Sequence, residues 1–400
     1  MSDLPLAGVR VLDLSAVIMG PWCTHALAGH GADVIKVEAR GGDTMRVADP
    51  CGHPGMAPMF QHSNRGKRSV VLDLKRPDGL AAALRLAARA DILVHNIRPA
   101  AADRLGLGWD AVRTVQPHIV YAALTGFGAD GPYGGRPAYD DLIQGASGLA
   151  AMFDPPRYVP SLVADRYVGM VAAAAILAAF VGARASGEGR AIEVPMFETM
   201  AEFVLADHLN GMTFDPPTGP VGYSRIVSPN RKPYATKDGH ICLIVYTEKH
   251  WLTFFTLAGR LDQFLADPIL HQPEARRGDF DRVYGMVADI VAERTTSEWL
   301  ALLKDADVPV MPLGRVETLV DDPHLAATGM LRTVDEGGER TRRVGAPVRW
   351  GAARPDPGAA PRLGEHTRAV LEEAGYAVAE IDAMVAGGTA VDGAHDSGAG

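Results

Sequence analysis

The 400-residue sequence predicts an α/β fold, with a Rossmann-like doubly wound large domain and a smaller α/β domain. Over the first 150 residues, short apolar runs typical of buried strands alternate with helical patterns. Strands separated by helices usually form parallel sheets. The same alternation resumes at about residue 239, beyond a segment rich in Pro and Gly. A hydrophobic content of 47% and a charged content of 22% suit two domains with sizeable cores.

The large domain begins with strands that are each followed by a helical pattern. Pro residues mark two predicted helix starts, because Pro is favoured in the first turn, where its missing N–H costs nothing. Gly31 marks the end of the first helix. In chain order the predicted elements are strand 9–14 (VRVLDL), a helix opening at Pro21, strand 32–38 (ADVIKVE), strand 68–74, a helix opening at Pro77, strand 91–97, partly helical 101–117, and strand 118–128.

Residues 157–184 (RYVPSLVADRYVGMVAAAAILAAFVGAR) place a carboxylate, Asp165, at the start of a long apolar run. Aspartate is a preferred N-cap, because its side chain accepts a hydrogen bond from a free amide of the first helical turn. The run 167–183 is apolar on every side but falls short of the ~20 residues that a membrane span needs. We therefore expect a helix at the centre of a large soluble core.

The rest of the chain divides the protein into four predicted segments. A strand at 190–196 and a helix at 195–210 complete the large domain, and Pro and Gly in 211–238 predict a linker. Strand 240–246 and the helices 248–260 and 281–306 form the smaller domain. The predicted boundaries are 1–210 for the large domain, 211–238 for the linker, 239–321 for the small domain, and 322–400 for a return segment to the large domain, with extended structure at 342–350 and a mobile tail at 385–400.

Composition excludes several classes of function. The net charge of -9 and pI of about 5.8 argue against general nucleic-acid binding. Cys23, Cys51 and Cys242 lie too far apart for a metal motif or a disulfide framework, and the histidines form no ligand pairs. The N-terminus lacks the features of a signal peptide, so we predict a soluble, cytoplasmic protein without a metal site.

The opening strand–helix–strand unit also invites comparison with dinucleotide-binding enzymes. Glu38 ends the second strand, where an acid can hold a ribose hydroxyl. However, the turn SAVIMGPW contains only Gly20, whereas the dinucleotide fingerprint needs three glycines. A phosphate-binding P-loop and the Gly-x-Ser-x-Gly motif of serine hydrolases are also missing.

A series of motifs in order resembles the class III CoA-transferases of the formyl-CoA transferase (CaiB/BaiF) type. The series contains PLAGVRVLDLS…GP, GADVIKVE, NRGKRSVVLDLK, DILVHNIRPAAADRLGLGWDAV, IVYAALTGFGADGPYGGRPAYD, PSLVADRYVGM, GEGRAIEVPMFETM and DDPHLAATGM. Each motif is modest alone, but their order and spacing match along most of the chain.

The resemblance implies that the protein moves CoA from an acyl-CoA donor to a carboxylic acid acceptor. In this family, an aspartate at the position of Asp165 attacks the acyl-CoA carbonyl, which is covalent catalysis by a carboxylate. An aspartyl–acyl anhydride and then an aspartyl-CoA thioester follow. The resemblance further implies an interlocked-ring homodimer. It implies acyl-CoA as a substrate rather than a permanently bound cofactor, and no membrane or nucleic-acid partner.

The resemblance also assigns residues to CoA. The backbone near Val17 receives the thiol arm, and cations hold the phosphates. The implied CoA-binding residues are Val17, Arg40, Leu72, Lys75, Asn96, Arg98, Arg104 and Tyr139. Arg46 is a further phosphate-binding candidate. Arg40 and Arg46 are equally open to interpretation as solvated surface charges, whereas for Lys75 and Arg104 CoA binding is the favoured interpretation.

Two features depart from formyl-CoA transferase itself. Ile18 stands where that enzyme has glutamine, and LIVYTEKHW (243–251) stands where it has a glycine-rich loop over the nucleophile. The formyl/oxalyl substrate pair is therefore not implied. Tyr139, Tyr223, Arg225 and Tyr246 are candidates to line an acyl pocket.

The principal competing function is that of an α-methylacyl-CoA racemase, which needs an acid/base group on each face of the α-carbon. The racemases pair a histidine with an aspartate at the position of Asp165, but here Tyr139 replaces the histidine. A tyrosine with a pKa near 10 is a poor base at neutral pH. Glu248 resembles a supporting glutamate of the racemases, although an acid at a helix start is the commoner meaning. The sequence also leaves open a dehydrogenase and a CoA-binding module without activity.

Overall fold

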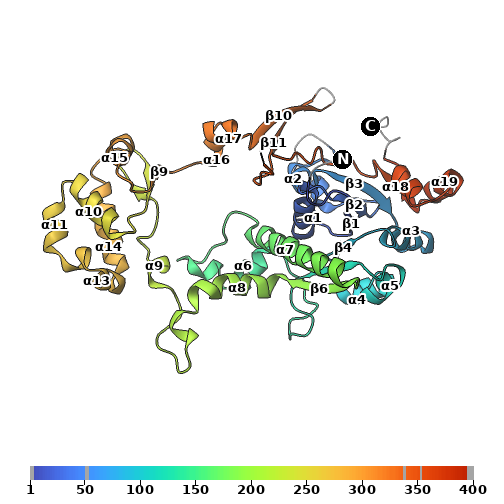
Figure 1. Cartoon of the computed structure of the whole chain (residues 1–400), viewed down its shortest axis with the longest axis horizontal. Helices are drawn as coiled ribbons and strands as arrows, with labels where there is room; N and C mark the ends of the chain where they lie inside the picture. Colours follow the sequence, from blue (N-terminus) through green and yellow to red (C-terminus); the bar gives the residue numbers. More distant parts are fainter. Residues whose placement is uncertain (1–3, 50–53, 337–338, 352–353, 394–400) are drawn as a thin grey trace. The chain divides into compact units, whose positions relative to one another are not determined.

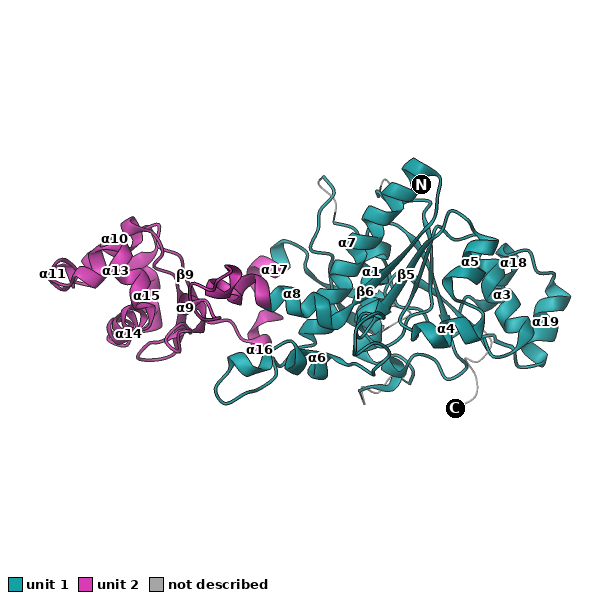
Figure 2. Cartoon of the chain, turned by 90° about the horizontal axis from the view of Figure 1, so that it is seen from below, with its two compact units in different colours: residues 1–204, 326–400 teal, residues 205–325 magenta. Residues whose placement is uncertain are grey.

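A computed structural model describes residues 4–49, 54–336, 339–351 and 354–393. The chain divides into two compact units, coloured separately in Figure 2. The first unit contains residues 1–204 and 326–400, and the second contains residues 205–325. The first unit is therefore built from two separate parts of the chain, and the second from one continuous part.

A seven-stranded sheet forms the centre of the first unit within the described residues. Neighbouring strands are parallel throughout, except that β12 is antiparallel to β3. The strand order is β12-β3-β2-β1-β4-β5-β6. The strands are β1 (Arg10–Asp13), β2 (Asp33–Glu38), β3 (Lys67–Leu72), β4 (Ile92–His95), β5 (Val120–Thr125), β6 (Arg190–Pro195) and β12 (Ala390–Val391). This mainly parallel sheet confirms the predicted α/β class.

Helices cover both faces of the sheet, which explains why its strands are nearly continuous apolar runs (Figure 1). Successive residues of one strand point to opposite faces, so Val11 packs in one hydrophobic cluster and Leu12 in the other. The first cluster contains residues of α1 (Met19–Gly29), α7 (Val163–Ser186) and α8 (Met196–His208). The second contains residues of α3 (Pro77–Ala87), α5 (Trp109–Val115), α18 (Thr367–Glu373) and α19 (Val378–Ala386).

Shorter elements complete the first unit. A two-stranded antiparallel ribbon pairs β10 (Leu331–Glu336) with β11 (Glu339–Val344). The remaining elements are η1 (Thr44–Val47), α2 (Pro58–Asn64), α4 (Pro99–Leu105), α6 (Asp140–Ala146) and η2 (Ala150–Met152).

Helix α7 differs from its prediction in two respects. It begins at Val163 with Leu162 as N-cap, so Asp165 is the third helical residue and not the cap, and no side chain caps this helix. One face packs on α1 and the sheet, but Met170, Ala174, Ala178 and Val181 form an exposed apolar stripe. By length and composition alone α7 could also cross a membrane, as can the core helix of a soluble protein.

The end of the chain is more ordered than predicted. Residues 385–393 belong to α19, a turn and β12, and the side chains of Thr389 and Ala390 are buried. The backbone N–H of Asp73 donates to the carbonyl of Thr389, and the hydroxyl of Thr389 donates to Asp78. The prediction of a mobile tail is therefore wrong for residues 385–393, because a two-residue strand gives no apolar period. Residues 394–400 lie outside the described part of the chain.

The second unit has its own hydrophobic core around a small antiparallel sheet. The sheet order is β7-β8-β9, and aromatic residues such as Trp251, Phe254 and Trp299 fill the core. The predicted linker 211–238 contains β7, whose Tyr234 is buried in this core. The elements are η3 (Asn210–Thr213), α9 (Ser224–Val227), β7 (Tyr234–Ala235), β8 (His240–Leu243), α10 (Glu248–Leu257), α11 (Leu261–Ala266), α12 (Pro268–His271), α13 (Pro273–Gly278), α14 (Phe280–Val291), α15 (Thr296–Leu303), β9 (Val310–Pro312), α16 (Val316–Leu319) and α17 (Pro323–Ala327), the last extending into the first unit.

Candidate active site

A cavity of about 300 Å³ lies beyond the carboxyl ends of β1, β4, β5 and β6 in the first unit. Strands β2 and β3 lie on one side of β1, and β4, β5 and β6 lie on the other. Open parallel sheets bind ligands at such a reversal of strand order, outside the carboxyl ends of the strands. The cavity includes the predicted residues Val17, Asn96, Arg98 and Tyr139, and its full lining comes from residues 16, 17, 19, 96–99, 124–127, 129, 135–139, 193 and 196.

The loop that follows β1 is held rigidly at the cavity wall. The side chain of Asn96 accepts a hydrogen bond from the Ala16 N–H at 3.0 Å and donates one to the Ala16 carbonyl at 2.7 Å. The next residue, Val17, has a φ of 73°. A positive φ is strained for a β-branched residue, and such strain often marks functional sites. Asn96 therefore fixes the backbone of Ala16, next to the strained residue Val17.

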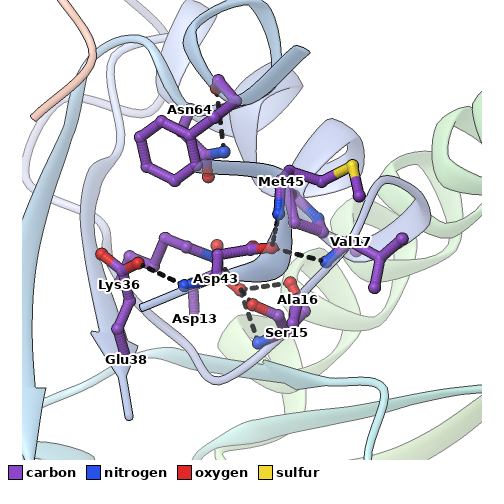
Figure 3. A network of polar contacts seen from close by, with 12 residues as sticks. Asp13, Ser15, Ala16, Val17, Lys36, Glu38, Asp43, Met45 and Asn64 are labelled. Carbon is purple, nitrogen blue, oxygen red and sulfur yellow. Dashed lines mark hydrogen bonds and ion pairs between the residues drawn. The ribbon is translucent and has the colours of Figure 1, made fainter. Parts of the chain in front are cut away.

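A buried cluster of acidic and basic side chains contacts this loop (Figure 3). Asp43 accepts from the N–H of Val17 at 3.2 Å and from the N–H of Met45 at 3.0 Å. Its other carboxylate oxygen lies 3.0 Å from the Nζ of Lys36, and both side chains are almost fully buried. Lys36 also donates to the carbonyl of Ser15 at 2.7 Å. Lys36 and Asp43 thus hold the chain on both sides of Ala16.

Asp13 and Lys67 extend the cluster from Ser15. Asp13 accepts from the N–H of Ser15 at 2.9 Å and from Lys67 Nζ at 3.0 Å. Lys67 also donates to the Pro21 carbonyl and the Asn64 side chain. Burial alone would raise the pKa of Asp13, but the charges of Lys67 and Lys36, together with hydrogen bonds, lower this pKa to about 2. Asp13 therefore remains ionised throughout the neutral range.

Asp165 lies in the first turn of α7, close to the segment that forms the cavity wall. Its backbone N–H donates to the carboxylate of Asp140 at 2.9 Å, and Asp140 directly follows the cavity residue Tyr139. Gln144 donates to the other oxygen of Asp140 at 2.6 Å. Gly169, one turn further along α7, packs against the backbone of Met19, which also lines the cavity. Asp165 itself does not belong to the cavity lining in this structure.

The environment of Asp165 favours its neutral form. The residue is only 9% exposed. Burial is the main cause that raises its pKa, and the neighbouring carboxylate of Asp140 adds to it, while Arg166 opposes both; the result is a pKa of about 7. A buried carboxyl with a pKa near neutrality, close to a cavity, is typical of catalytic groups.

The other predicted CoA-binding residues lie outside this cavity lining. Arg40, Lys75 and Arg104 are exposed, on the loops after β2 and β3 and in the last turn of α4. Arg40 approaches Gly388 near the end of the described chain. The side chain of Leu72 is completely buried in the core, and its residue pairs with Ala390 of β12, so this side chain is not available to a surface ligand.

Glu38 and Arg46 form a bidentate ion pair and neither is free for a ligand. Arg46 donates to both carboxylate oxygens of Glu38, at 2.8 and 2.7 Å, and both residues are buried. The guanidinium of Arg46 also lies over the ring of Phe60 at 3.7 Å. The hypothesis that Arg46 binds a phosphate is therefore wrong. Arg46 also engages both carboxylate oxygens of Glu38, the acid that would have to bind the ribose of a dinucleotide.

Three of the four candidate acyl-pocket residues meet in the second unit. Tyr223, Arg225 and Tyr246 line a cavity of about 420 Å³, whereas Tyr139 belongs to the first unit. Glu248 is the first residue of α10 and forms an ion pair with Arg276. Glu248 thus lies at a helix start, as the sequence pattern predicted.

The structure also locates the two departures from formyl-CoA transferase, Ile18 and residues 243–251. Ile18 is buried, so its side chain does not line the cavity in place of the glutamine. In the stretch 243–251, Ile244 and Tyr246 are exposed between β8 and α10.

Metal chemistry gains no support from the side chains. Within the described ranges, no group of three or more His, Cys, Asp or Glu residues is placed to hold a metal ion. Cys23 is buried and Cys242 is exposed, both as free thiols, and Cys51 lies outside the described residues.

Sequence reasoning missed Lys36, Asp43 and Asp140. Lys36 looked like an ordinary charge in an apolar strand, and nothing in the sequence relates Asp140 to Asp165, which lies 25 residues away. The one available signal was a charged residue inside a strand that is otherwise apolar, since a buried charge requires a partner.

Comparison with known proteins identifies the family. The model of CoA-transferase family III matches residues 6–367. The chain is 31% identical to succinate–glutarate CoA-transferase of Agrobacterium fabrum, with 92% of this chain and 95% of that protein covered. It is 32% identical to succinyl-CoA:mesaconate CoA-transferase of Haloarcula hispanica, with 92% and 96% covered, and 29% identical to formyl-CoA:oxalate CoA-transferase of Escherichia coli O157:H7, with 95% and 98% covered.

Solved structures agree with this assignment. The crystal structure of an aspartate-to-alanine mutant of Rv3272 from Mycobacterium tuberculosis has a TM-score of 0.81 and 29% identity, with 92% of this chain and 98% of that chain covered. A CAIB/BAIF family protein from Brucella suis has a TM-score of 0.78 and 27% identity, with 93% and 100% covered. The resemblance found in the sequence motifs is confirmed: the chain belongs to CoA-transferase family III and is a CoA-transferase.

Proposed function

We propose that the protein transfers CoA from an acyl-CoA to a carboxylic acid through covalent intermediates on Asp165. The observation that carries this proposal is a buried carboxyl with a pKa of about 7, placed beside the wall of the cavity at the sheet edge. In water a carboxylate has a pKa near 3.9 and is a weak nucleophile. Removal of its solvation shell makes Asp165 more basic than an exposed aspartate, and so more reactive once ionised.

In the first half of the proposed reaction, an oxygen of ionised Asp165 attacks the thioester carbonyl carbon. The carbon–sulfur bond breaks, CoA leaves as the thiolate, and an aspartyl–acyl anhydride remains. The thiolate then attacks the aspartyl carbonyl carbon. This forms the aspartyl-CoA thioester and releases the donor acid as its carboxylate.

In the second half, the acceptor carboxylate attacks the aspartyl thioester and displaces CoA thiolate. The thiolate attacks the acyl carbon of the new anhydride, which yields the new acyl-CoA and regenerates Asp165. No proton is gained or lost over the cycle, so the site needs no general acid. This is consistent with a cavity lining in which none of the described residues is histidine.

In the proposed CoA site, residues of the cavity hold one end of CoA and exposed cations hold the other. Val17, Asn96, Arg98 and Tyr139 hold the thiol arm, because they line the cavity at the carboxyl ends of the strands. The exposed cations Arg40, Lys75 and Arg104 bind the phosphates and adenosine end. Binding of the phosphates and adenosine, which lie far from the reacting carbon, contributes free energy that orients the thioester for attack. Acyl-CoA is therefore a substrate, and no permanently bound cofactor is part of the proposal.

Asp165→Ala tests the mechanism, and Asp141→Ala is the matched control because Asp141 is an exposed acid on α6. We expect the Asp165 variant to lose transfer yet still bind CoA in a calorimetric titration. We expect the control to retain both. Mass spectrometry of the wild-type chain incubated with acyl-CoA and hydroxylamine should find a hydroxamate at residue 165. Ordinary turnover of the Asp165→Ala variant would refute the covalent mechanism.

Racemase chemistry is not favoured. Tyr139 is 69% exposed and precedes α6, and the described cavity lining offers no histidine to exchange a proton at the α-carbon. In heavy water, a bound 2-methylacyl-CoA should gain no deuterium at this carbon. New acyl-CoA should form only when an acceptor acid is present. Rapid exchange without an acceptor would instead support a racemase.

We further propose that the chain forms an interlocked homodimer in the cytoplasm. The apolar stripe of Met170, Ala174, Ala178 and Val181 supports a partner surface, because such contiguous exposed apolar residues are uncommon on monomers.

The strand order 3-2-1-4-5-6 supports the proposed Rossmann-like description of the large unit. The homodimer can be tested separately. Sedimentation at decreasing concentration should show no folded, active monomer, since folding and assembly would be one event.

A further inference from the structure

A second cavity of the first unit, with a volume of about 370 Å³, is lined by residues of α1, α2 and α7 and of the segment that follows β11. Its walls are mainly apolar and include Trp22, Ala26 and Val348 together with three prolines. No Asp or Glu of the described residues lines it. A concave, mainly apolar site with a few polar groups is the usual form of a small-molecule pocket.

Three histidines of this cavity, His25, His30 and His62, are uncharged near pH 7. Burial is the main cause that lowers the pKa of each imidazole, and the pKa of His25 falls to about 4. The Nδ1 of His25 also lies 3.2 Å from the carbonyl oxygen of Arg65. The histidines therefore add polar atoms to the cavity but no net charge.

Arg65 is charged but fully engaged with the cavity wall. It is only 4% exposed, and its Nε donates to the carbonyl of Gly358 at 3.0 Å. Its two terminal nitrogens donate to the carbonyl of Val344 and to the carboxylate of Asp356. These bonds hold the segment after β11 against the end of α2, and they leave Arg65 no free donor direction for a ligand.

Arg166, the other arginine of the cavity, has no such partners. Within the described part of the chain, its side chain forms no ion pair and donates no hydrogen bond. Its guanidinium lies 4.2 Å from the ring centre of Trp22, a contact that fixes its plane and leaves its N–H groups open. Burial lowers the pKa of Arg166, against the opposing effect of the Asp165 charge. A half-buried cation without a hydrogen-bonded partner favours the binding of an anion.

Arg166 also connects this cavity with the proposed nucleophile. It directly follows Asp165 on α7, and its charge acts on the Asp165 carboxyl, whose pKa it lowers against the larger effect of burial. The backbone N–H of Asp165 donates to Asp140, which follows Tyr139 in the cavity proposed for the thiol arm. Asp165 therefore has close neighbours that belong to both cavities or adjoin them.

Resting on the CoA-transferase function proposed above, we infer that this second cavity binds an apolar monocarboxylic acid, with its carboxylate on Arg166 and its hydrocarbon chain along Trp22 and the prolines. The fork of a guanidinium matches the two oxygens of a carboxylate. In the second half of the proposed reaction, this carboxylate is the one that attacks the aspartyl thioester, and the donor acid leaves from the same place. Arg166 thus binds the reacting acid, and the apolar walls select its chain.

The first experiment measures binding of octanoate, octanamide and acetate by ligand-observed NMR, in the wild type and in Asp165→Ala. Octanamide keeps the chain without the charge, and acetate keeps the charge without the chain. We expect octanoate to bind more tightly than either. Arg166→Gln should lower the octanoate-to-octanamide affinity ratio by roughly 10- to 100-fold, because hydrogen bonds to a charged group are lost. Arg184→Gln is the matched control and should leave this ratio unchanged, since Arg184 is exposed on the same helix and also lies over a ring, that of Phe180.

The second experiment places a side chain in the space assigned to the hydrocarbon chain. Gly29 is the last residue of α1 and lines the cavity, and a Cβ added there would meet no atom within 4 Å. We expect Gly29→Leu to lower the octanoate-to-acetate ratio, both in affinity and in kcat/KM, by at least about 10-fold, because several methylene groups lose their buried position. Gly278→Leu is the control and should leave the ratio unchanged, since Gly278 ends α13 in equally open surroundings, in the second unit.

The other outcomes overturn the inference. Equal losses of octanoate and octanamide on Arg166→Gln would mean that Arg166 is structural, and an unchanged ratio or no octanoate binding would mean that the cavity does not hold the acid. A loss of CoA affinity on Arg166→Gln, with the acid ratio intact, would show a phosphate site. Altered sedimentation of Gly29→Leu, with octanoate affinity intact, would show that a second copy of the chain fills the cavity.

Failure of the covalent mechanism gives a different result. It appears as transfer activity in the Asp165→Ala chain, and it leaves the affinity ratios of octanoate, octanamide and acetate measurable in that same chain.

Discussion

Replacement of the buried acid Asp165 by its neutral isostere should stabilise the protein while it abolishes transfer. Asp165→Asn keeps the shape of the side chain and removes the charge that is buried next to Asp140. In the wild type, the folded pKa of about 7 exceeds the ordinary value of 3.8. The folded protein therefore binds the Asp165 proton more tightly than the unfolded chain does, so wild-type stability falls as pH rises between these values.

The size of the gain follows from the two pKa values. Linkage gives an advantage for Asp165→Asn of about 2 kcal/mol at pH 5 and about 4 kcal/mol at pH 8. Below the unfolded pKa, both states of the wild type are protonated and the advantage disappears. The value at pH 8 is reached only above the folded pKa, where Asp165 is ionised in both states.

The assay is urea unfolding of wild type and Asp165→Asn at pH 5 and pH 8. Protein concentration is held constant, because assembly contributes to apparent stability. The control is Asp141→Asn, which neutralises an exposed acid on α6 and should show no comparable dependence on pH. A variant that is no more stable than the wild type at pH 8 would refute the claim that Asp165 is held in a costly ionised state.

Three further perturbations test the framework of the site. Activity of the wild type should fall below pH 7 as Asp165 becomes protonated; a kcat that is constant down to pH 5 would contradict this. Lys36→Met leaves Asp43 buried without its counter-ion and should lower the free energy of unfolding by roughly 3–5 kcal/mol. Lys36→Met/Asp43→Asn should lose less, and an additive loss in urea titrations would argue against the pairing. Asn96→Ala removes both bonds to Ala16 and should weaken CoA binding by about 1–3 kcal/mol, measured by calorimetry; unaltered affinity would exclude this positioning role.

The strands of the large unit could be predicted because they are buried on both faces. Residues 9–14 and 32–38 are apolar runs bounded by turn signals, and β1 and β2 lie within them. Of the strands that were missed, β7, β9 and β12 are only two or three residues long, whereas β10 (Leu331–Glu336) has six residues. A period of two cannot be recognised over two or three residues, and pairing with distant strands creates β7, β9 and β12.

The candidate site could be predicted only in part, for a related reason. Motif resemblance selected Asp165, Val17 and Asn96 without their contacts. The acids and cations that tune them are distant in sequence, as Asp140 is from Asp165 and Asp43 from Val17. Motif resemblance also selected Leu72 as a CoA-binding residue, although its side chain is buried in the core. A residue within a matched motif therefore need not have its side chain at the site.

The position of β12 has a consequence for the synthesis of the protein. The large unit needs residues from both ends of the chain, since β12 pairs with β3. The second unit, residues 205–325, is continuous and has its own core, so it can fold while translation proceeds. The edge of β3 stays unpaired until β12 has been synthesised, and an open strand edge favours association with other chains. We therefore expect the growing chain to be prone to association through this edge until β12 pairs with β3, whatever the stability of the finished sheet.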